Sequence, residues 1–202
     1  MVVNGKSYCV GIITYSKRKH YIENLIEDIR KQSNVSIFLA INADYKKEFD
    51  NEYRNFILNL CSKYDNEYPS FYLKFKGLAR LWNDLIINCG HDNCIILNDD
   101  IRIKEGFIDN LIKHKDSIGN NTIMTTNNMF CAFVVNKNFM DSVGYFNEYY
   151  IGIGFEDYEF HRRMGRMGLL VNGDIQTFKT DGFINLTDEA VTTFIGNENN
   201  KP

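Results

Sequence analysis

The 202-residue sequence has only two prolines, no paired cysteine motif, no long apolar run and little net charge. Its five cysteines are scattered without a C-x-x-C pair, which argues against both a disulfide framework and a zinc cluster. No apolar stretch approaches the roughly 20 residues that a membrane-spanning helix needs. Residues 1–6 lack the charged-then-apolar layout of a signal peptide. We therefore expect a reducing, cytoplasmic setting and no transmembrane segment.

The charge balance does not favour nucleic acid as a partner. A net charge of −3 gives the chain no strong field for a phosphate backbone. The basic run at 17–20, taken alone, indicates the solvated start of a helix. With 44% hydrophobic and 24% charged residues, the composition is typical of a globular protein with a real core. Only the tail at 197–202 has nothing apolar to bury, so disorder is expected there alone.

Apolar runs alternate with amphipathic segments along the chain. Short, almost wholly apolar runs are typical of strands buried on both faces, and a spacing of three to four predicts helices. Strands are expected at 8–13, 35–41, 71–73, 94–97, 123–125 and 130–135, and helices at 19–32, 49–60, 78–87, 106–114 and 156–167. This alternation predicts a single α/β domain over 1–202, with a mixed, mostly parallel sheet flanked by helices.

Polar segments follow three of the expected strands, at 14–16, 42–44 and 98–100. Ligands of open α/β sheets bind outside the carboxyl ends of the strands. We therefore expect these three segments to converge on one rim of the molecule.

The sharpest local signal is the pair Asp99 and Asp100, which follows Asn98 at the end of an apolar strand. Neighbouring carboxylates raise one another's pKa, so the pair needs a compensating cation or exposure to water. A hard divalent metal would compensate it, because Mg²⁺ or Mn²⁺ takes one or two protein carboxylates and completes its shell with water and substrate phosphates. The alternative is an ordinary turn, where these residue types are common for backbone reasons.

A second acidic segment opens the last expected helix. A loop broken by glycines leads into Glu156 and Asp157. Acidic residues favour a helix N-terminus by about 0.3–1 kcal/mol each, which is the structural explanation. The functional explanation makes one carboxylate a general base on a flexible rim. Glu159 diverges from Asp157 on the helix, and we expect it to pair with Arg162 or Arg163.

Together, these segments resemble the family-2-type glycosyltransferases with the GT-A fold. Residues 10–18 resemble the family's first strand and its Thr-Tyr-Asn-Arg-like turn, and residues 38–44 resemble its strand ending in Asp-Asp-Gly-Ser. Residues 76–83 resemble its Lys-Gly-x-Ala-x-x-x-Asn helix, and residues 98–100 occupy the position of its Asp-x-Asp motif. Residues 143–148 and 154–160 resemble its Gly-x-Phe-Asp-Glu and Glu-Asp signatures. The last stretch is also similar to the Trp-Gly-x-Glu-Asp segment of β-1,4-galactosyltransferases, although Ile153 stands where tryptophan would. The resemblance covers about 8–168.

The resemblance implies a GT-A-like domain with a Rossmann-like half at about 8–104 that binds a nucleotide sugar. It implies an acceptor and catalytic half at about 105–180 and a tail at 181–202. The expected donor is a sugar linked to uridine diphosphate. The acceptor is a glycan, glycolipid or protein, with a surface glycan or glycolipid as the default. A modified nucleic-acid base stays open but is not favoured, and the oligomeric state is not readable from the sequence.

The resemblance also assigns residues to the donor. The implied donor-binding residues are Thr14 and Tyr15 at the base pocket, Asn42 or Asp44 at the uracil imide, Arg80 and Asn83 beside the pyrophosphate and sugar, and Asn98 or Asp99 at the ribose or sugar. Because this chain has Asn-Ala-Asp where the family has Asp-Asp-Gly, the choice between Asn42 and Asp44 stays open.

Asp100 is the expected ligand of the Mn²⁺ or Mg²⁺ cofactor. Asn98 carries a neutral amide, which is a weaker metal ligand than a carboxylate. Relatives often add a histidine ligand further on, but no histidine follows His161. We therefore expect the metal to be bound loosely, mainly through the diphosphate.

The implied reaction is a single in-line displacement that inverts the anomeric carbon of the sugar. Asp157 is the expected general base, and Glu156 orients the acceptor or the sugar. The metal neutralises charge on the departing diphosphate.

Two alternatives remain open at this point. A nucleotidyltransferase would need a glycine-rich phosphate loop after the first strand, and residues 14–17 contain no glycine. A binding module that kept the fold and lost activity is the other alternative, and Asn98 speaks mildly for it.

Overall fold

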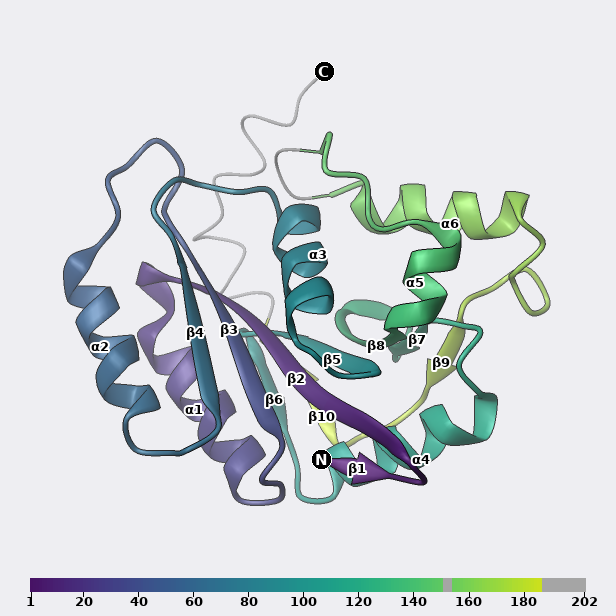
Figure 1. The fold of residues 1–202 in the computed structure, drawn as a ribbon, viewed down its shortest axis with the longest axis horizontal. Helices are drawn as coiled ribbons and strands as arrows, with labels where there is room; N and C mark the ends of the chain where they lie inside the picture. Colours follow the sequence, from purple (N-terminus) through teal and green to yellow (C-terminus); the bar gives the residue numbers. More distant parts are fainter. Residues whose placement is uncertain (151–153, 187–202) are drawn as a thin grey trace.

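A mixed, mostly parallel sheet forms the centre of the molecule (Figure 1), in a computed structural model that describes residues 1–150 and 154–186. The sheet has eight strands in the order β4-β3-β2-β5-β8-β7-β9, with β1 paired to β2. The strands are β1 Val2–Val3, β2 Lys6–Tyr15, β3 Ser36–Asn42, β4 Glu67–Tyr72, β5 Asn93–Asn98, β7 Met124–Thr126, β8 Met129–Asn136 and β9 Gln176–Phe178. Strand β2 pairs in parallel with both β3 and β5, so the first half of the chain is a βαβ arrangement.

Helices cover both faces of this sheet. The helices are α1 Lys19–Arg30, α2 Asn51–Cys61 and α4 Phe107–Ile118 on one face, and α3 Leu78–Asn88, α5 Lys137–Val143 and α6 Glu156–Arg166 on the other. Alternate residues of β2 serve the two cores: Val10 and Ile12 face α1, while Cys9 and Ile13 face α3. In the part of the chain that the structure describes, no helix is both long and apolar enough to cross a membrane.

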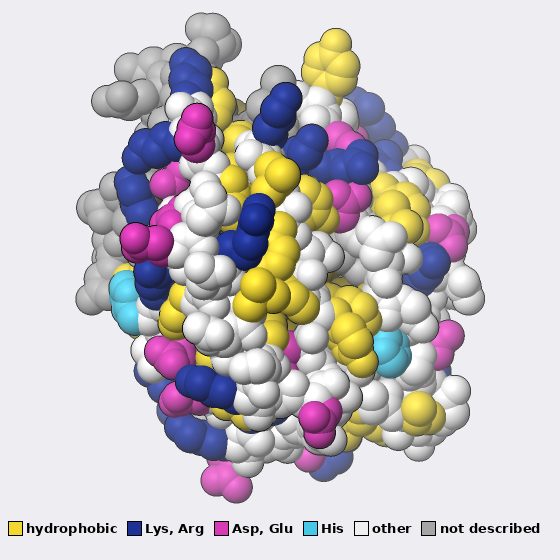
Figure 2. All heavy atoms as spheres, turned by 60° about the vertical axis from the view of Figure 1, so that its left-hand side comes forward, with side chains coloured by type: hydrophobic (Ala, Val, Ile, Leu, Met, Phe, Trp, Pro, Cys, Tyr) yellow, Lys and Arg dark blue, Asp and Glu magenta, His cyan; other side chains and the backbone are white. Residues whose placement is uncertain are grey.

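The expected strands and helices are confirmed, although their boundaries differ, for example in the third expected strand, at 71–73. Strand β4 begins at Glu67 rather than at residue 71, and it contains Pro69. Because β4 is an edge strand, a residue without an N–H is tolerated there. Figure 2 shows the side that carries α2 and β4, where hydrophobic side chains lie among charged ones. Tyr68 of β4 is among the partly exposed aromatics.

Several short elements were not expected from the sequence. Strand β6, Ile101–Ile103, pairs antiparallel with β10, Phe183–Asn185, in a second, two-stranded sheet. Strand β10 therefore lies within the segment that was expected to be a tail from residue 181. The disorder expected at 197–202 concerns residues outside the described ranges.

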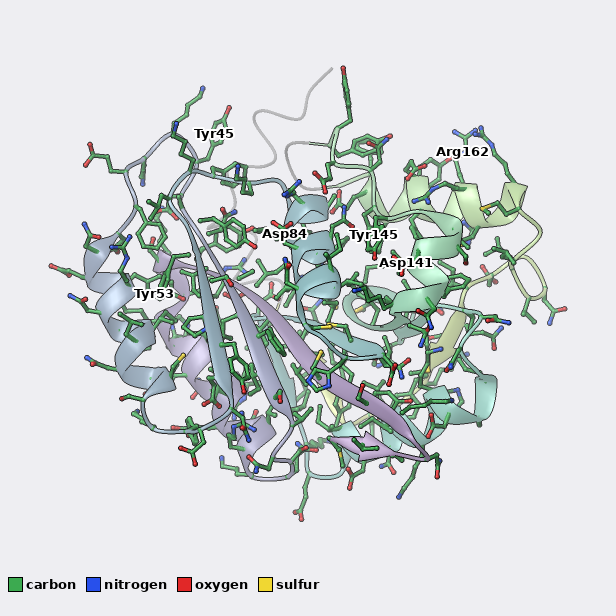
Figure 3. The ribbon with its side chains drawn as sticks, in the orientation of Figure 1. Tyr45, Tyr53, Asp84, Asp141, Tyr145 and Arg162 are labelled. Atoms are coloured by element: carbon green, nitrogen blue, oxygen red, sulfur yellow. The ribbon has the colours of Figure 1, made fainter. Side chains whose placement is uncertain are left out.

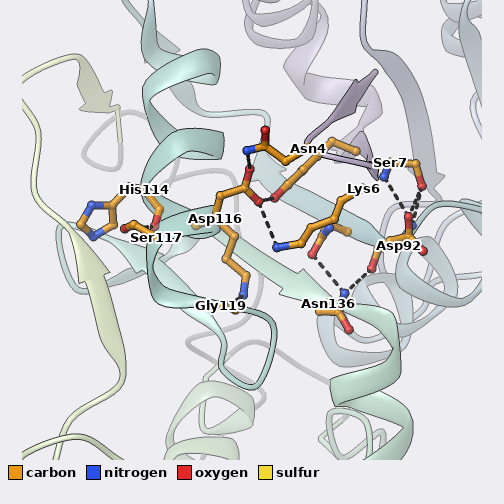
Figure 4. A network of polar contacts seen from close by, with 12 residues as sticks. Asn4, Lys6, Ser7, Asp92, His114, Asp116, Ser117, Gly119 and Asn136 are labelled. Carbon is orange, nitrogen blue, oxygen red and sulfur yellow. Dashed lines mark hydrogen bonds and ion pairs between the residues drawn. The ribbon is translucent and has the colours of Figure 1, made fainter.

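Polar contacts fix the amino-terminal end of the sheet (Figure 4). Asp116 of α4 accepts hydrogen bonds from Tyr8 at 2.6 Å and from Lys6 at 3.3 Å. Asp92, just before β5, accepts from the hydroxyl and the backbone N–H of Ser7 at 2.7 and 2.8 Å. These contacts join the start of β2 to α4 and to the residue before β5.

Candidate active site at the carboxyl edge of the sheet

The three polar segments converge on one edge, as the sequence predicts. Strand β2 lies between β3 and β5, and the parallel register places Tyr15 beside Asn42 and Ile13 beside Asn98. Thr14 is fully buried, and its hydroxyl shares a 2.5 Å hydrogen bond with Tyr53 of α2, which lies against the sheet (Figure 3). The side chain of Thr14 near the end of β2 is therefore held in a fixed position at the rim.

Arg18 is one of the site residues that the sequence analysis missed. It ends a short 3-10 helix, Ser16–Arg18, directly after β2 and is only 3% exposed. Its Nη1 lies 2.5 Å from Asp99 Oδ1 and 3.6 Å from Asp100 Oδ2. The interpretation of the basic run as a solvated helix start holds for the exposed Lys17 and Lys19 but is wrong for Arg18. The signal was available, because two adjacent acids require a cation and Arg18 follows the neighbouring strand.

The positive charge of Arg18 does not fully compensate the free-energy cost of burying the carboxylates of Asp99 and Asp100. Burial raises the pKa of Asp99 to about 6, although Arg18 opposes the rise, and the charge of Asp100 adds to it. Burial also raises the pKa of Asp100 against the same guanidinium. Both carboxyls would therefore gain from a further cation at this edge.

The oxygen atoms at this edge suit a hard divalent cation. Four buried side-chain oxygens at this edge have no hydrogen-bond partner among residues 1–150 and 154–186: Asn98 Oδ1, Asp99 Oδ2, Asp100 Oδ1 and Asn185 Oδ1. Asn185 reaches the edge because β10 pairs with β6, and the next residue's N–H bonds to the Asp100 carbonyl at 2.8 Å. Mg²⁺ and Mn²⁺ prefer carboxylate and amide oxygens of this kind. No sequence signal indicated Asn185, because its position depends on a three-residue strand.

Two asparagines that were expected to bind the donor form hydrogen bonds to the backbone of neighbouring segments. The amide of Asn42 donates to the Lys76 carbonyl at 2.9 Å and accepts from the Lys76 N–H at 3.0 Å. Asn83 of α3 does the same with Phe146, at 2.9 and 3.0 Å, and also donates to Glu148 Oε1. Both side chains are buried and occupied, so their contribution to donor binding remains a prediction. In the pair Asn42 and Asp44, Asp44 is the more exposed.

Arg80 also has partners within the protein. Its guanidinium bonds to Asp84 at 3.1 Å, one turn further along α3, and to Glu148 at 2.9 Å. Glu148, which was not expected at the site, thereby connects to α3 through both Arg80 and Asn83. These contacts hold residues 146–148 against α3.

The second acidic segment lies at the start of α6, beside the start of α3 in Figure 1. Phe160 of α6 packs on Phe146 with ring centroids 4.6 Å apart, and Asn83 holds Phe146 to α3. Glu156 is 3% exposed, and its burial raises its pKa to about 7. Asp157 is partly exposed, and its Oδ1 accepts from the Tyr158 N–H at 2.8 Å. The two neighbouring carboxyls thus have different environments.

Two further contacts stabilise this region. Trp82 is a core residue, 2% exposed and packed against Phe133 and Phe146. Glu159 pairs with Arg163 at 3.3 Å, as the helical spacing predicts.

The fold is the GT-A fold of nucleotide-sugar glycosyltransferases. No protein-family model matches the sequence, and no curated protein is similar enough to match. The solved structure of GalNAc-T7 with UDP, GalNAc and Mn²⁺ superposes with a TM-score of 0.68 at 9% identity. The similarity covers 90% of this chain and 44% of GalNAc-T7, so the chain spans less than half of that protein.

Two other glycosyltransferase structures show the same fold. A mannosyltransferase from Pyrobaculum calidifontis, in complex with GDP-Man and Mn²⁺, has a TM-score of 0.64 at 11% identity, covering 87% of this chain and 55% of its own. Glucosyl-3-phosphoglycerate synthase from Mycobacterium tuberculosis, with Mn²⁺ and UDP, has a TM-score of 0.64 at 9% identity, covering 94% of this chain and 76% of its own. At these identities the likeness establishes the fold alone.

Proposed function

We propose that this chain is an inverting glycosyltransferase that moves a sugar from a nucleotide diphosphate donor, expected to be a UDP-sugar, to an acceptor hydroxyl. The observation that carries the proposal is the carboxyl edge, where Asn98 and Asp100 offer buried oxygens that have no hydrogen-bond partner among the described residues, next to the end of β2. This edge is where open α/β sheets bind ligands. The metal-containing, nucleotide-bound neighbours with the same fold support it.

Asp100, with Asn98 and Asn185, would hold Mn²⁺ or Mg²⁺. Such an ion supplies compensation for negative charge on a departing diphosphate. Arg18 holds Asp99 and keeps its carboxylate at the rim, where the ribose or sugar is expected. Thr14, Tyr15 and Asp44 line the place assigned to the base.

We assign the general base to Asp157 and a neighbouring hydrogen-bonding role to Glu156. Asp157 is the more exposed of the two, so an acceptor hydroxyl can approach it. Glu156 is buried with a pKa raised to about 7, so a large share of it carries a proton near neutrality and can donate a hydrogen bond. The competing assignment makes Glu156 the general base, because a group with a pKa near the working pH is well suited to accept a proton.

The test measures nucleotide release and sugar transfer across a panel of nucleotide sugars and acceptors, with and without Mn²⁺. Asp100→Asn is expected to lose metal-dependent activity, whereas Asp109→Asn, an exposed change on α4, keeps it. Asp157→Asn is expected to abolish transfer while donor binding survives. Glu156→Gln, which resembles the protonated acid, is expected to retain much of the rate.

Two results contradict this assignment. Full transfer by Asp157→Asn, together with an inactive Glu156→Gln and a rate that falls below about pH 7, makes Glu156 the base. Donor binding without turnover on any acceptor makes the chain a nucleotide-sugar-binding module.

A further inference from the structure

Three of the five cysteines lie together in the core, although their spacing along the chain argues against a cluster. They are Cys9 on β2, Cys94 on β5 and Cys89, which ends α3, and we call them the cysteine trio. Their Sγ atoms all lie within 4.8 Å of one another, and each residue is at most 3% exposed. The parallel register pairs Cys9 directly with Cys94. The sheet register and α3 therefore create a contact that no local motif reveals.

The spacing of the trio suits a single metal ion. Thiolates bound to one ion at about 2.3 Å lie roughly 3.8–4 Å from one another. Sulfur atoms already within 4.8 Å reach that arrangement by small side-chain rotations. The neighbouring helix is held close, because a Cβ at Gly11 would lie 3.2 Å from Leu85 of α3 and 3.3 Å from Cys94 Sγ.

The surroundings of the trio favour a cation. Cys89 caps the C-terminus of α3, the end of the helix that carries partial negative charge. Its Sγ contacts the Ile86 carbonyl at 3.4 Å, and Cys9 Sγ contacts the Asn93 carbonyl at 3.7 Å.

His91 lies in the loop between Cys89 and Cys94. Its ring nitrogens are not among the ligand atoms that lie within 4.8 Å of one another. The ring packs edge-on against Phe38 instead, at a centroid distance of 6.1 Å. The three cysteines are therefore the ligands that the geometry supports.

We propose that Cys9, Cys89 and Cys94 bind one thiophilic metal ion, Zn²⁺. As the ion enters, each thiol loses its proton to solvent and three sulfur–metal bonds form. Thiolates select zinc over Mg²⁺ and Mn²⁺, so this site is chemically distinct from the oxygen-lined edge at Asp100. The ion would join β2, β5 and the end of α3 near the amino-terminal half of the strands.

The first experiment uses the wild-type protein, because it needs no substitution in the core. The protein is unfolded under reducing conditions and refolded with Zn²⁺ or Co²⁺, since the site is closed in the folded state. Elemental analysis is expected to give one zinc per chain, released when a mercurial reagent modifies the thiols. The cobalt form is expected to show sulfur-to-cobalt charge-transfer absorption, which oxygen ligands cannot produce. The zinc form is expected to unfold at a higher temperature than the metal-free form.

Variants assign the ligands. Cys89→Ser is expected to lose the zinc and the cobalt band, whereas Cys61→Ser, at a buried cysteine of α2 outside the trio, keeps both. Asp100→Asn is also expected to keep them, so the result does not depend on the proposed glycosyltransferase function. His91→Ala, at a histidine outside the trio, is expected to keep the zinc and the cobalt band. A wild-type protein that takes up no zinc on refolding, or a Cys89→Ser variant that retains it, overturns the proposal.

Discussion

Removing Arg18 tests the electrostatic account of the carboxyl edge. Its guanidinium is buried and lies 2.5 Å from Asp99, which is itself fully buried. Breaking a buried ion pair by deleting one partner typically costs about 3–5 kcal/mol, because an uncompensated charge remains. We therefore expect Arg18→Met to lower the free energy of unfolding by roughly that amount at pH 8. Adding Asp99→Asn to Arg18→Met should restore much of the loss.

The pH dependence gives this prediction its sign. The folded-state pKa of Asp99 is raised to about 6 with Arg18 present, against about 3.9 in an unfolded chain. Without Arg18 it rises further. When the pKa of a carboxyl is higher in the folded than in the unfolded protein, its contribution to the free energy of unfolding is fully present below the unfolded-state pKa. That contribution is lost as the pH rises through the folded-state pKa. The deficit of Arg18→Met should therefore be largest at pH 8 and shrink toward pH 5.

Urea unfolding followed by circular dichroism at pH 5 and pH 8 measures both quantities. Lys63→Met is the matched control, because Lys63 and Glu23 form an exposed pair at 3.3 Å whose loss should cost less than about 1 kcal/mol. An Arg18→Met protein as stable as the wild type at pH 8, or with the same deficit at both pH values, would refute the reasoning.

Three further changes probe the packing and the second acidic segment. Gly11→Ala places a Cβ 2.9 Å from Ile96 Cδ1, so we expect a loss of about 1–3 kcal/mol in thermal unfolding as α3 shifts. Asn83→Ala removes both hydrogen bonds to the Phe146 backbone. It should lower the free energy of unfolding by about 1–3 kcal/mol and make the chain around Phe146 easier to cleave by a protease. Glu156 has a folded pKa of about 7, so wild-type stability should fall as the pH rises through 7. In Glu156→Gln, the decrease in the free energy of unfolding between pH 5 and pH 9 should be smaller by roughly 2–4 kcal/mol.

The rim could be predicted from the sequence because two general rules coincide there. Wholly apolar runs mark buried parallel strands, and polar residues just after them lie at a common edge. Thr14, Asn42 and Asn98 come together for that reason. The composition of the run around Arg18, by contrast, is typical of a solvated helix start, and only the bend of the chain after β2 buries that one side chain.

Other features depend on contacts that local patterns do not encode. Asn185 reaches the site through β10, a three-residue strand too short to show periodicity. The clamping of Phe146 by Asn83 joins residues 63 apart in the sequence. The cysteine trio depends on the register of β2 against β5, and a one-residue shift would point Cys94 to the other face.

Arg18 also gives a physical reason for Asn98 at a position where the resembling family has an aspartate. With Asp99 and Asp100 against Arg18, the edge carries one excess negative charge, which a divalent ion converts to one excess positive charge suited to a diphosphate. An aspartate at 98 would bring that sum to zero. On the proposed function, we expect Asn98→Asp to bind Mn²⁺ more tightly while its metal-loaded form binds UDP more weakly. Calorimetry of Mn²⁺ alone, then of UDP at saturating Mn²⁺, separates the two effects. Tighter binding of both would show that Asn98 does not act through charge.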